Sequence, residues 1–155
     1  KAVADGRDLE ARAHMMSAAT MGATAFQKGL GAIHSLSHPV GSYYDTHHGL
    51  TNAVFTPYVL QYNRPAIEEP LLRLSRWLDL PSNGYQAVLD WILKLREQLN
   101  IPHTADKLGV EESCLTELAE MAAKDPTAST NPLPVGKAQM LAMYRAAMIG
   151  QLDSR

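Results

Sequence analysis

The chain has 155 residues, of which 46% are hydrophobic and 19% are charged. This length suits one domain with its own core, and the apolar content excludes an intrinsically disordered chain. Fourteen basic and sixteen acidic residues give a formal net charge of −2 without a basic stripe, which argues against nucleic acid as a partner. The single cysteine, Cys114, excludes an internal disulfide framework and predicts a reducing, cytoplasmic location.

The first two predicted elements are helices with few charges. One is expected over residues 8–28 and ends before a pair of glycines. The next is expected over residues 31–44, where Pro39 predicts a kink or a restart near His38. Residues 13–44 carry one formal charge, so we expect the first three helices to be the most buried. Their glycines and polar side chains argue against a membrane-spanning helix.

The rest of the chain also predicts helices, because alanine and leucine are abundant and no hairpin signal is present. These helices are expected over residues 48–62, 65–79, 82–99, 111–124 and 135–152. The apolar residues of the segment 82–99 follow the 3.6-residue helical period. Trp77 and Trp91 are expected in the core. We therefore predict one all-α domain of about seven helices over residues 1–155.

A cluster of histidines is the strongest chemical signal in the chain. Four of the six histidines lie between His34 and His48. His34 and His38 are four residues apart and share a helix face, while His48 follows across a turn. Neutral imidazoles bind Fe²⁺ or Zn²⁺, and Asp45 is placed to complete the shell or to orient an imidazole. Histidine pairs at this spacing are more often surface or core residues, so these residues alone leave both roles open.

The histidine cluster lies within a longer recognisable pattern. Residues 29–41 read Gly-Leu-Gly-Ala-Ile-His-Ser-Leu-Ser-His-Pro-Val-Gly, and residues 45–49 read Asp-Thr-His-His-Gly. This pattern resembles the iron-containing alcohol dehydrogenase family. The segment 5–8, Gly22 and the Asn131-Pro132 pair are also similar to the corresponding parts of that family. The resemblance extends over nearly the whole chain.

The resemblance implies a site divided between two domains. Family members have an N-terminal half that binds NAD or NADP and an all-α C-terminal half that holds a divalent metal, most often Fe²⁺ and alternatively Zn²⁺. It implies that His34 and His48 are metal ligands, and that His38 is a catalytic residue beside the metal and the nicotinamide. His47 receives no role. The other two family ligands lie upstream in an Asp-x-x-x-His arrangement, and no such pair precedes Lys1.

The implied activity is hydride transfer between the carbon of a small alcohol or aldehyde and nicotinamide, with the metal as a Lewis acid. The missing partner is the N-terminal nucleotide-binding domain, and the chain alone is expected to be inactive. The face that this domain would cover is expected to be apolar, which favours a homo-oligomer. The alternatives are a stand-alone helical metal-binding or interaction module without redox activity, and a family branch that has lost the metal.

Overall fold

The computed structural model describes residues 1–152, and this part of the chain is all-α, as predicted. It contains six α-helices rather than about seven, together with short 3₁₀ turns. The α-helices are α1 (Leu9–Ala25), α2 (Ala32–Tyr44), α3 (His48–Trp77), α4 (Tyr85–Gln98), α5 (Leu115–Lys124) and α6 (Lys137–Ile149). The 3₁₀ turns are η1 (Phe26–Lys28), η2 (Ala105–Leu108), η3 (Glu112–Cys114) and η4 (Pro126–Thr130).

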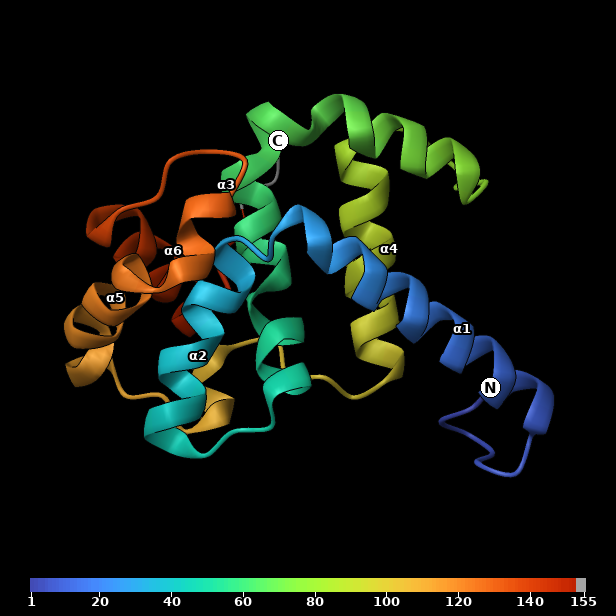
Figure 1. Cartoon of the computed structure of the whole chain (residues 1–155), viewed down its shortest axis with the longest axis horizontal. Helices are drawn as coiled ribbons and strands as arrows, with labels where there is room; N and C mark the ends of the chain where they lie inside the picture. The colour runs from blue at the N-terminus through green and yellow to red at the C-terminus, as the bar shows by residue number, and fades with distance from the viewer. Residues whose placement is uncertain (153–155) are drawn as a thin grey trace.

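The helix count differs because two predicted helices form the single helix α3. The sequence predicted a stop at Asn63 and Pro65, but α3 continues through Pro57, Pro65 and Pro70. It rises through the centre of the molecule and then bends to run along its top (Figure 1). Proline inside a helix removes a backbone hydrogen bond and bends the helix without necessarily ending it. In the same way, α2 runs on through Pro39 where the sequence predicted a kink or a restart.

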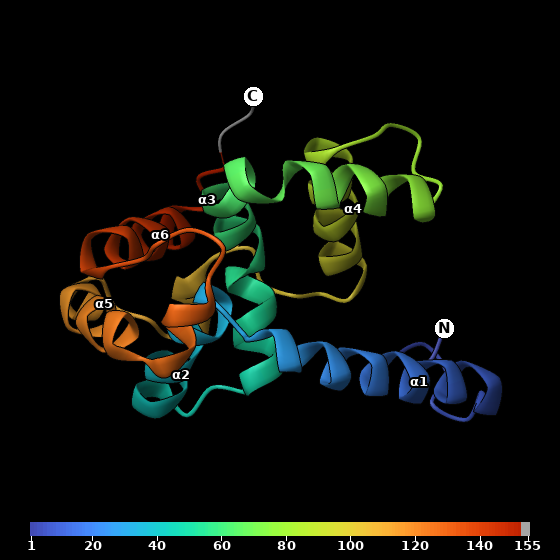
Figure 2. The same cartoon turned by 45° about the horizontal axis from the view of Figure 1, so that its top comes forward.

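Two cores hold the helices together. The main core lies among α2, the first half of α3, α5 and α6 (Figures 1 and 2). At its centre the Tyr144 hydroxyl donates to the Leu36 carbonyl over 2.6 Å, and the Tyr144 ring meets Phe55 edge-on at 5.4 Å. A smaller core joins the second half of α3 to the predicted apolar face of α4. Its buried members are Leu71, Tyr85, Val88 and Leu89.

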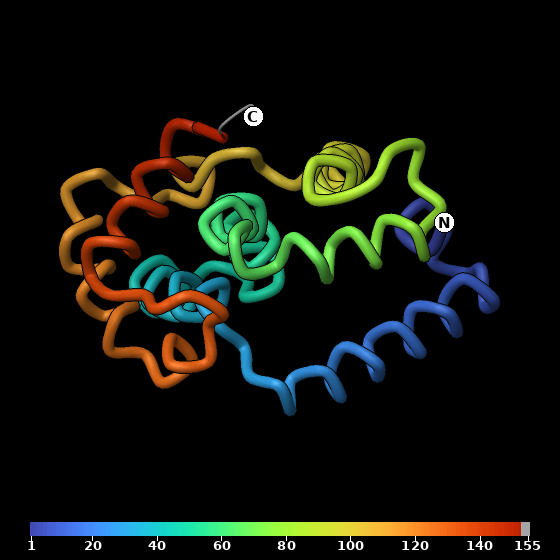
Figure 3. The backbone as a smooth tube through the Cα atoms, turned by 90° about the horizontal axis from the view of Figure 1, so that it is seen from above, coloured from blue at the N-terminus to red at the C-terminus, as the bar shows by residue number. Residues whose placement is uncertain are grey.

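The predicted burial of the first helix is wrong. Helix α1 projects from the body and stands apart from α4 (Figures 2 and 3), and Ala11 is its only buried residue. Large apolar side chains that it leaves exposed are Leu9, Met15, Met16 and Met21. A helix with so little charge and no distinct polar face is typical of one that is covered by protein on most sides. The contacts that its composition indicates are therefore not made within residues 1–152.

The predicted burial of the two tryptophans is also wrong. Trp77, the last residue of α3, is 89% exposed, and Trp91 on α4 is 40% exposed. Trp91 falls outside the face of α4 that Tyr85, Val88 and Leu89 turn towards α3. Residue type alone does not show which side of an amphipathic helix a side chain occupies.

Over the described residues 1–152, the structure contains no helix with the length and apolar character needed to cross a membrane.

Candidate functional site

The beginning of α2, which carries two of the histidines, is fixed by the loop before α6. Gly31 N–H donates to Thr130 Oγ1 over 3.2 Å, and Ala32 N–H donates to Asn131 Oδ1 over 3.1 Å. Gly29 has φ 100° and Gly31 has φ 70°, a region that favours glycine. A Cβ atom on Gly29 would lie only 2.3 Å from the Thr130 side chain. These two glycines let the chain pass close to the loop and set the position of α2.

The structure brings together the three histidines that the sequence singled out. His34 and His38 lie one turn apart on α2, and His48 is the first residue of α3. Their ring centroids are 5.8 Å apart for His34 and His38, 5.2 Å for His34 and His48, and 5.5 Å for His38 and His48. The Phe26 ring meets His34 edge-on at 5.6 Å. Three imidazoles therefore form one cluster where α2, α3 and η1 meet.

Asn52, which the sequence reasoning missed, joins two of these rings. Its amide nitrogen lies 3.2 Å from His34 Nε2 and 3.0 Å from His48 Nε2. An amide NH₂ group only donates hydrogen bonds, so each Nε2 accepts through its lone pair. Two imidazole lone pairs thus converge on one small volume. The signal for Asn52 was its spacing, because a residue four positions after His48 lies one helical turn away.

The surroundings of His34 keep this imidazole uncharged. Partial burial lowers its pKa from 6.5, and the positive charges that His48 and His38 would carry lower it further. The Leu30 carbonyl and the Asp125 carboxylate oppose this shift without reversing it. A metal-binding imidazole has to be neutral. His34 is therefore in the protonation state that a metal ligand requires at neutral pH.

The same shift predicts that acid destabilises the fold. The unfolded chain keeps the ordinary pKa of 6.5 for His34, whereas the folded chain has a lower one. The unfolded state therefore binds more protons as the pH falls below 6.5, and the free energy of unfolding decreases there. We expect the urea midpoint of wild type to decrease when the pH is lowered from about 8 to about 5, and to decrease less in His34→Gln. His14→Gln, on exposed α1, is the control; an identical pH dependence in both variants would contradict this expectation.

His38 forms a hydrogen bond with Asp125, a residue far from it in the sequence. Its Nδ1 lies 2.8 Å from Asp125 Oδ2, at the end of α5. Burial favours the protonated form of Asp125, but hydrogen bonds from Thr127 and the contact with His38 outweigh it, so the pKa of Asp125 is lowered. The carboxylate is therefore ionised at neutral pH. Sequence reasoning missed Asp125, because no local pattern relates residues 87 positions apart.

His47 and Asp45, the other two candidates from this region, lie at helix ends outside the imidazole cluster. His47 precedes α3, and its Nδ1 accepts a hydrogen bond from Leu50 N–H over 3.2 Å, which caps the helix. Asp45 ends α2 in the left-handed conformation, with φ 49°. Within residues 1–152, no hydrogen bond or ion pair joins Asp45 to an imidazole of the cluster. The suggested role of Asp45 as a ligand or an orienting group therefore has no contact to support it.

The fit of the cluster to a divalent metal ion depends on its donor atoms. Among the residues that the structure describes, no group of three or more His, Cys, Asp or Glu side chains is arranged to hold a metal ion. His34 and His48 nevertheless direct Nε2 atoms towards the same point, which is the arrangement of two neighbouring ligands. These residues fit a divalent cation as two of its ligands. The remaining coordination positions require groups from outside this set.

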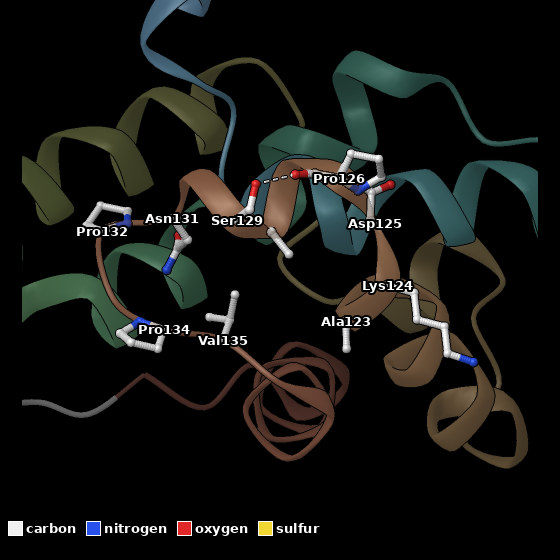
Figure 4. A pocket seen from close by; sticks show the side chains of 10 residues that line it. Ala123, Lys124, Asp125, Pro126, Ser129, Asn131, Pro132, Pro134 and Val135 are labelled. Atoms are coloured by element: carbon white, nitrogen blue, oxygen red, sulfur yellow. Dashed lines mark hydrogen bonds between the residues drawn. The ribbon is translucent and has the colours of Figure 1, made fainter.

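A separate hollow is lined in part by Asp125. It has a volume of about 710 Å³ and is formed by the end of α5 and the loop that leads to α6 (Figure 4). Ser129 Oγ donates to the Pro126 carbonyl at its edge over 2.7 Å. No histidine lines this hollow. The hollow adjoins the imidazole cluster through Asp125, whose Oδ2 faces His38.

Sequence comparison shows that the chain is similar to one part of several longer proteins. Residues 1–148 match the C-terminal part of the Fe-containing alcohol dehydrogenase family. The chain is 37% identical over 159 residues to 4-hydroxybutyrate dehydrogenase of Cupriavidus necator, a match that covers 96% of this chain and 41% of that protein. It is 32% identical over 154 residues to 1,3-propanediol dehydrogenase of Citrobacter freundii, covering 95% of this chain and 40% of that protein.

Solved structures show the same relationship. A 1,3-propanediol oxidoreductase matches with a TM-score of 0.89 at 32% identity, over 95% of this chain and 40% of that one. An alcohol dehydrogenase from Oenococcus oeni matches with a TM-score of 0.87 at 30% identity. This match covers 94% of the present chain and 40% of the Oenococcus oeni chain. The chain spans about two fifths of the length of these relatives. Since nearly all of its residues take part in each match, the protein belongs to the Fe-containing alcohol dehydrogenase family and corresponds to its C-terminal domain.

Proposed function

We propose that this chain is the metal-binding part of an NAD- or NADP-dependent oxidoreductase that interconverts small alcohols and aldehydes. The observation that carries the proposal is the convergence of His34 Nε2 and His48 Nε2 on one point. The relatives named for 4-hydroxybutyrate and 1,3-propanediol support an alcohol as the substrate class. Hydride transfer between the alcohol carbon and nicotinamide is the corresponding reaction.

Each histidine of the cluster has a part in this proposal. His34 and His48 would hold the cation through Nε2; the family name favours Fe²⁺, and imidazole ligands also suit Zn²⁺. When bound, such a cation supplies Lewis-acid chemistry, which lowers the pKa of an alcohol hydroxyl. His38 would hold or move a proton at Nε2 and would contact the nicotinamide, as the family resemblance implies; imidazole is the side chain most often used for proton transfer. The Asn52 amide nitrogen lies at the point on which both Nε2 atoms converge, so it would have to turn away for a cation to bind there.

The rest of the proposed enzyme lies in the part of the relatives that this chain does not match. We assign to that part the nucleotide-binding domain and the remaining metal ligands, with the alcohol bound between the two domains. The exposed apolar side chains of α1 provide a surface that such a domain or a second copy of the chain would cover. A homo-oligomer is part of the same proposal.

The proposed division of the site predicts that this chain alone does not turn over. We expect no reduced cofactor to form when the chain is mixed with Zn²⁺ or Fe²⁺, NAD⁺ and 1,3-propanediol, as followed by ultraviolet absorbance. A longer protein that carries this chain behind its own nucleotide-binding domain should turn over under the same conditions. Turnover by the chain alone would show that the division is wrong, and an inactive longer protein would refute the proposed activity.

A second candidate function is a helical metal-binding or interaction module without redox activity. The exposed surface of α1 favours it, because exposed apolar side chains of this size mark interaction surfaces. The oxidoreductase and a metal-binding module both predict metal binding by His34 and His48, whereas an interaction module does not. Only the oxidoreductase predicts turnover by the longer protein, so the experiment above also separates these two functions.

A further inference from the structure

We infer that Asp125 is a positioning residue for His38, which it holds as the Nδ1–H tautomer so that Nε2 carries the free lone pair. The catalytic use of this tautomer rests on the proposed function. The tautomer itself is a property of this chain. The carboxylate comes from the end of α5, and the imidazole lies on α2, so the contact also ties these two helices together.

The first support is that both oxygens of Asp125 are engaged. Oδ1 accepts from Thr127 N–H over 2.8 Å and from Thr127 Oγ1 over 2.6 Å. Oδ2 faces His38 Nδ1 at 2.8 Å. The Asp125 side chain is only 13% exposed, so solvent does not compete freely for these positions. Two donors on Oδ1 fix the plane of the carboxylate and leave Oδ2 for the imidazole.

The second support is the direction of each hydrogen bond. An ionised carboxylate only accepts, so the proton between Asp125 and His38 belongs to Nδ1. The Thr127 hydroxyl likewise donates to Oδ1. Ser35 Oγ on α2 lies 2.9 Å from Thr127 Oγ1 and 3.2 Å from the Gly31 carbonyl, so its single hydroxyl proton has two acceptors within reach. The chain of contacts starts at Ser35, passes through Thr127 and Asp125, and returns to α2 at His38. From Thr127 through Asp125 to His38, each group has one allowed role as donor or acceptor.

This arrangement predicts an unusual result for Asp125→Asn. The two Thr127 donors still require an acceptor at the Oδ1 position, so the asparagine carbonyl turns towards Thr127. Its NH₂ group then faces His38 Nδ1 and must donate to it. His38 Nδ1 becomes an acceptor, and the ring proton moves to Nε2. The substitution therefore reverses the tautomer rather than merely loosening the ring.

The experiment reads the tautomer directly by long-range proton–nitrogen NMR. The ¹⁵N-labelled chain is treated with a chelator and measured at about pH 8, where an ordinary imidazole is neutral. We expect wild-type His38 to show a protonated Nδ1 and an unprotonated Nε2. Asp125→Asn should exchange these two nitrogen signatures. Asp125→Ala removes the partner and should give intermediate shifts, because both tautomers of the half-exposed ring then exchange.

Two controls separate this effect from general damage. Thr127→Val removes one donor but keeps the carboxylate, so His38 should retain Nδ1–H. Asp90→Asn, at an exposed position on α4, should change nothing at His38. Wild-type His38 with its proton on Nε2, or a folded Asp125→Asn chain that keeps Nδ1–H, would overturn the inference. A longer protein without dehydrogenase activity would refute only the proposed function and leave this NMR result unaffected.

Discussion

Replacing Asn131 with alanine should lower the free energy of unfolding by about 3 kcal/mol, because several buried polar groups lose their only partner at once. Asn131 and Asn63 form a reciprocal amide pair, with nitrogen-to-oxygen distances of 2.8 and 2.9 Å. Asn131 Oδ1 also accepts from Ala32 N–H at the beginning of α2, and its NH₂ group donates to the Leu133 carbonyl. Asn63 is 5% exposed, so water does not replace the lost bonds.

The effect of Asn131→Ala is measurable by urea unfolding, followed by circular dichroism. Asn83→Ala, in the exposed loop before α4, is the matched control and should stay within about 0.5 kcal/mol of wild type. The double variant Asn63→Ala/Asn131→Ala should cost less than the sum of the two single changes, because both break the same pair. Additive costs, or a wild-type midpoint for Asn131→Ala, would show that the amide pair does not stabilise the fold.

Replacing His34 or His48 with alanine should weaken Zn²⁺ binding to this chain at least tenfold. Loss of an outer-shell partner of a metal ligand already costs about 10- to 100-fold in affinity, and here one of only two ligands is removed. Wild-type affinity itself should be modest, because this chain supplies an incomplete shell. Isothermal titration calorimetry measures the Zn²⁺ affinity of wild type and of each variant. The use of Zn²⁺ avoids the oxidation of Fe²⁺.

His14→Ala is the matched control for metal binding, because His14 lies on exposed α1, away from the cluster. It should bind Zn²⁺ as wild type does. Amide NMR spectra of all three variants establish that each one is folded. Wild-type affinity in both folded His34→Ala and His48→Ala would show that the convergence of the two Nε2 atoms has no role in metal binding, and would remove the main support for the proposed function.

The histidine cluster was predictable because its first step is local. His34 and His38 lie on the same face of α2 for the reason that residues four apart always do. The chain turns over residues 45–47, and His48 at the beginning of α3 lies beside both rings. The family pattern then identified which histidines matter. The approach of His48 to His34, near the start of α2, depended on how α2 and α3 pack.

The residues that support the cluster were not predictable in this way. Asp125 reaches His38 across 87 positions, and Asn131 reaches the beginning of α2 across 99. Along the sequence, both fall in a loop whose polar residues look like ordinary turn formers. The burial of α1 was misjudged for a related reason, because low charge indicates that a helix needs a cover but not whether the same chain provides it.

Helical content, the apolar face of α4 and the grouping of the imidazoles on α2 thus follow from the residues themselves, because the helical repeat relates neighbours over three or four positions. Tertiary packing alone decided that α3 continues past its prolines, that α1 stands free, and that Asp125 and Asn131 hold α2 in place. These contacts depend on the free energy of the whole assembled core. No short stretch of sequence contains that information.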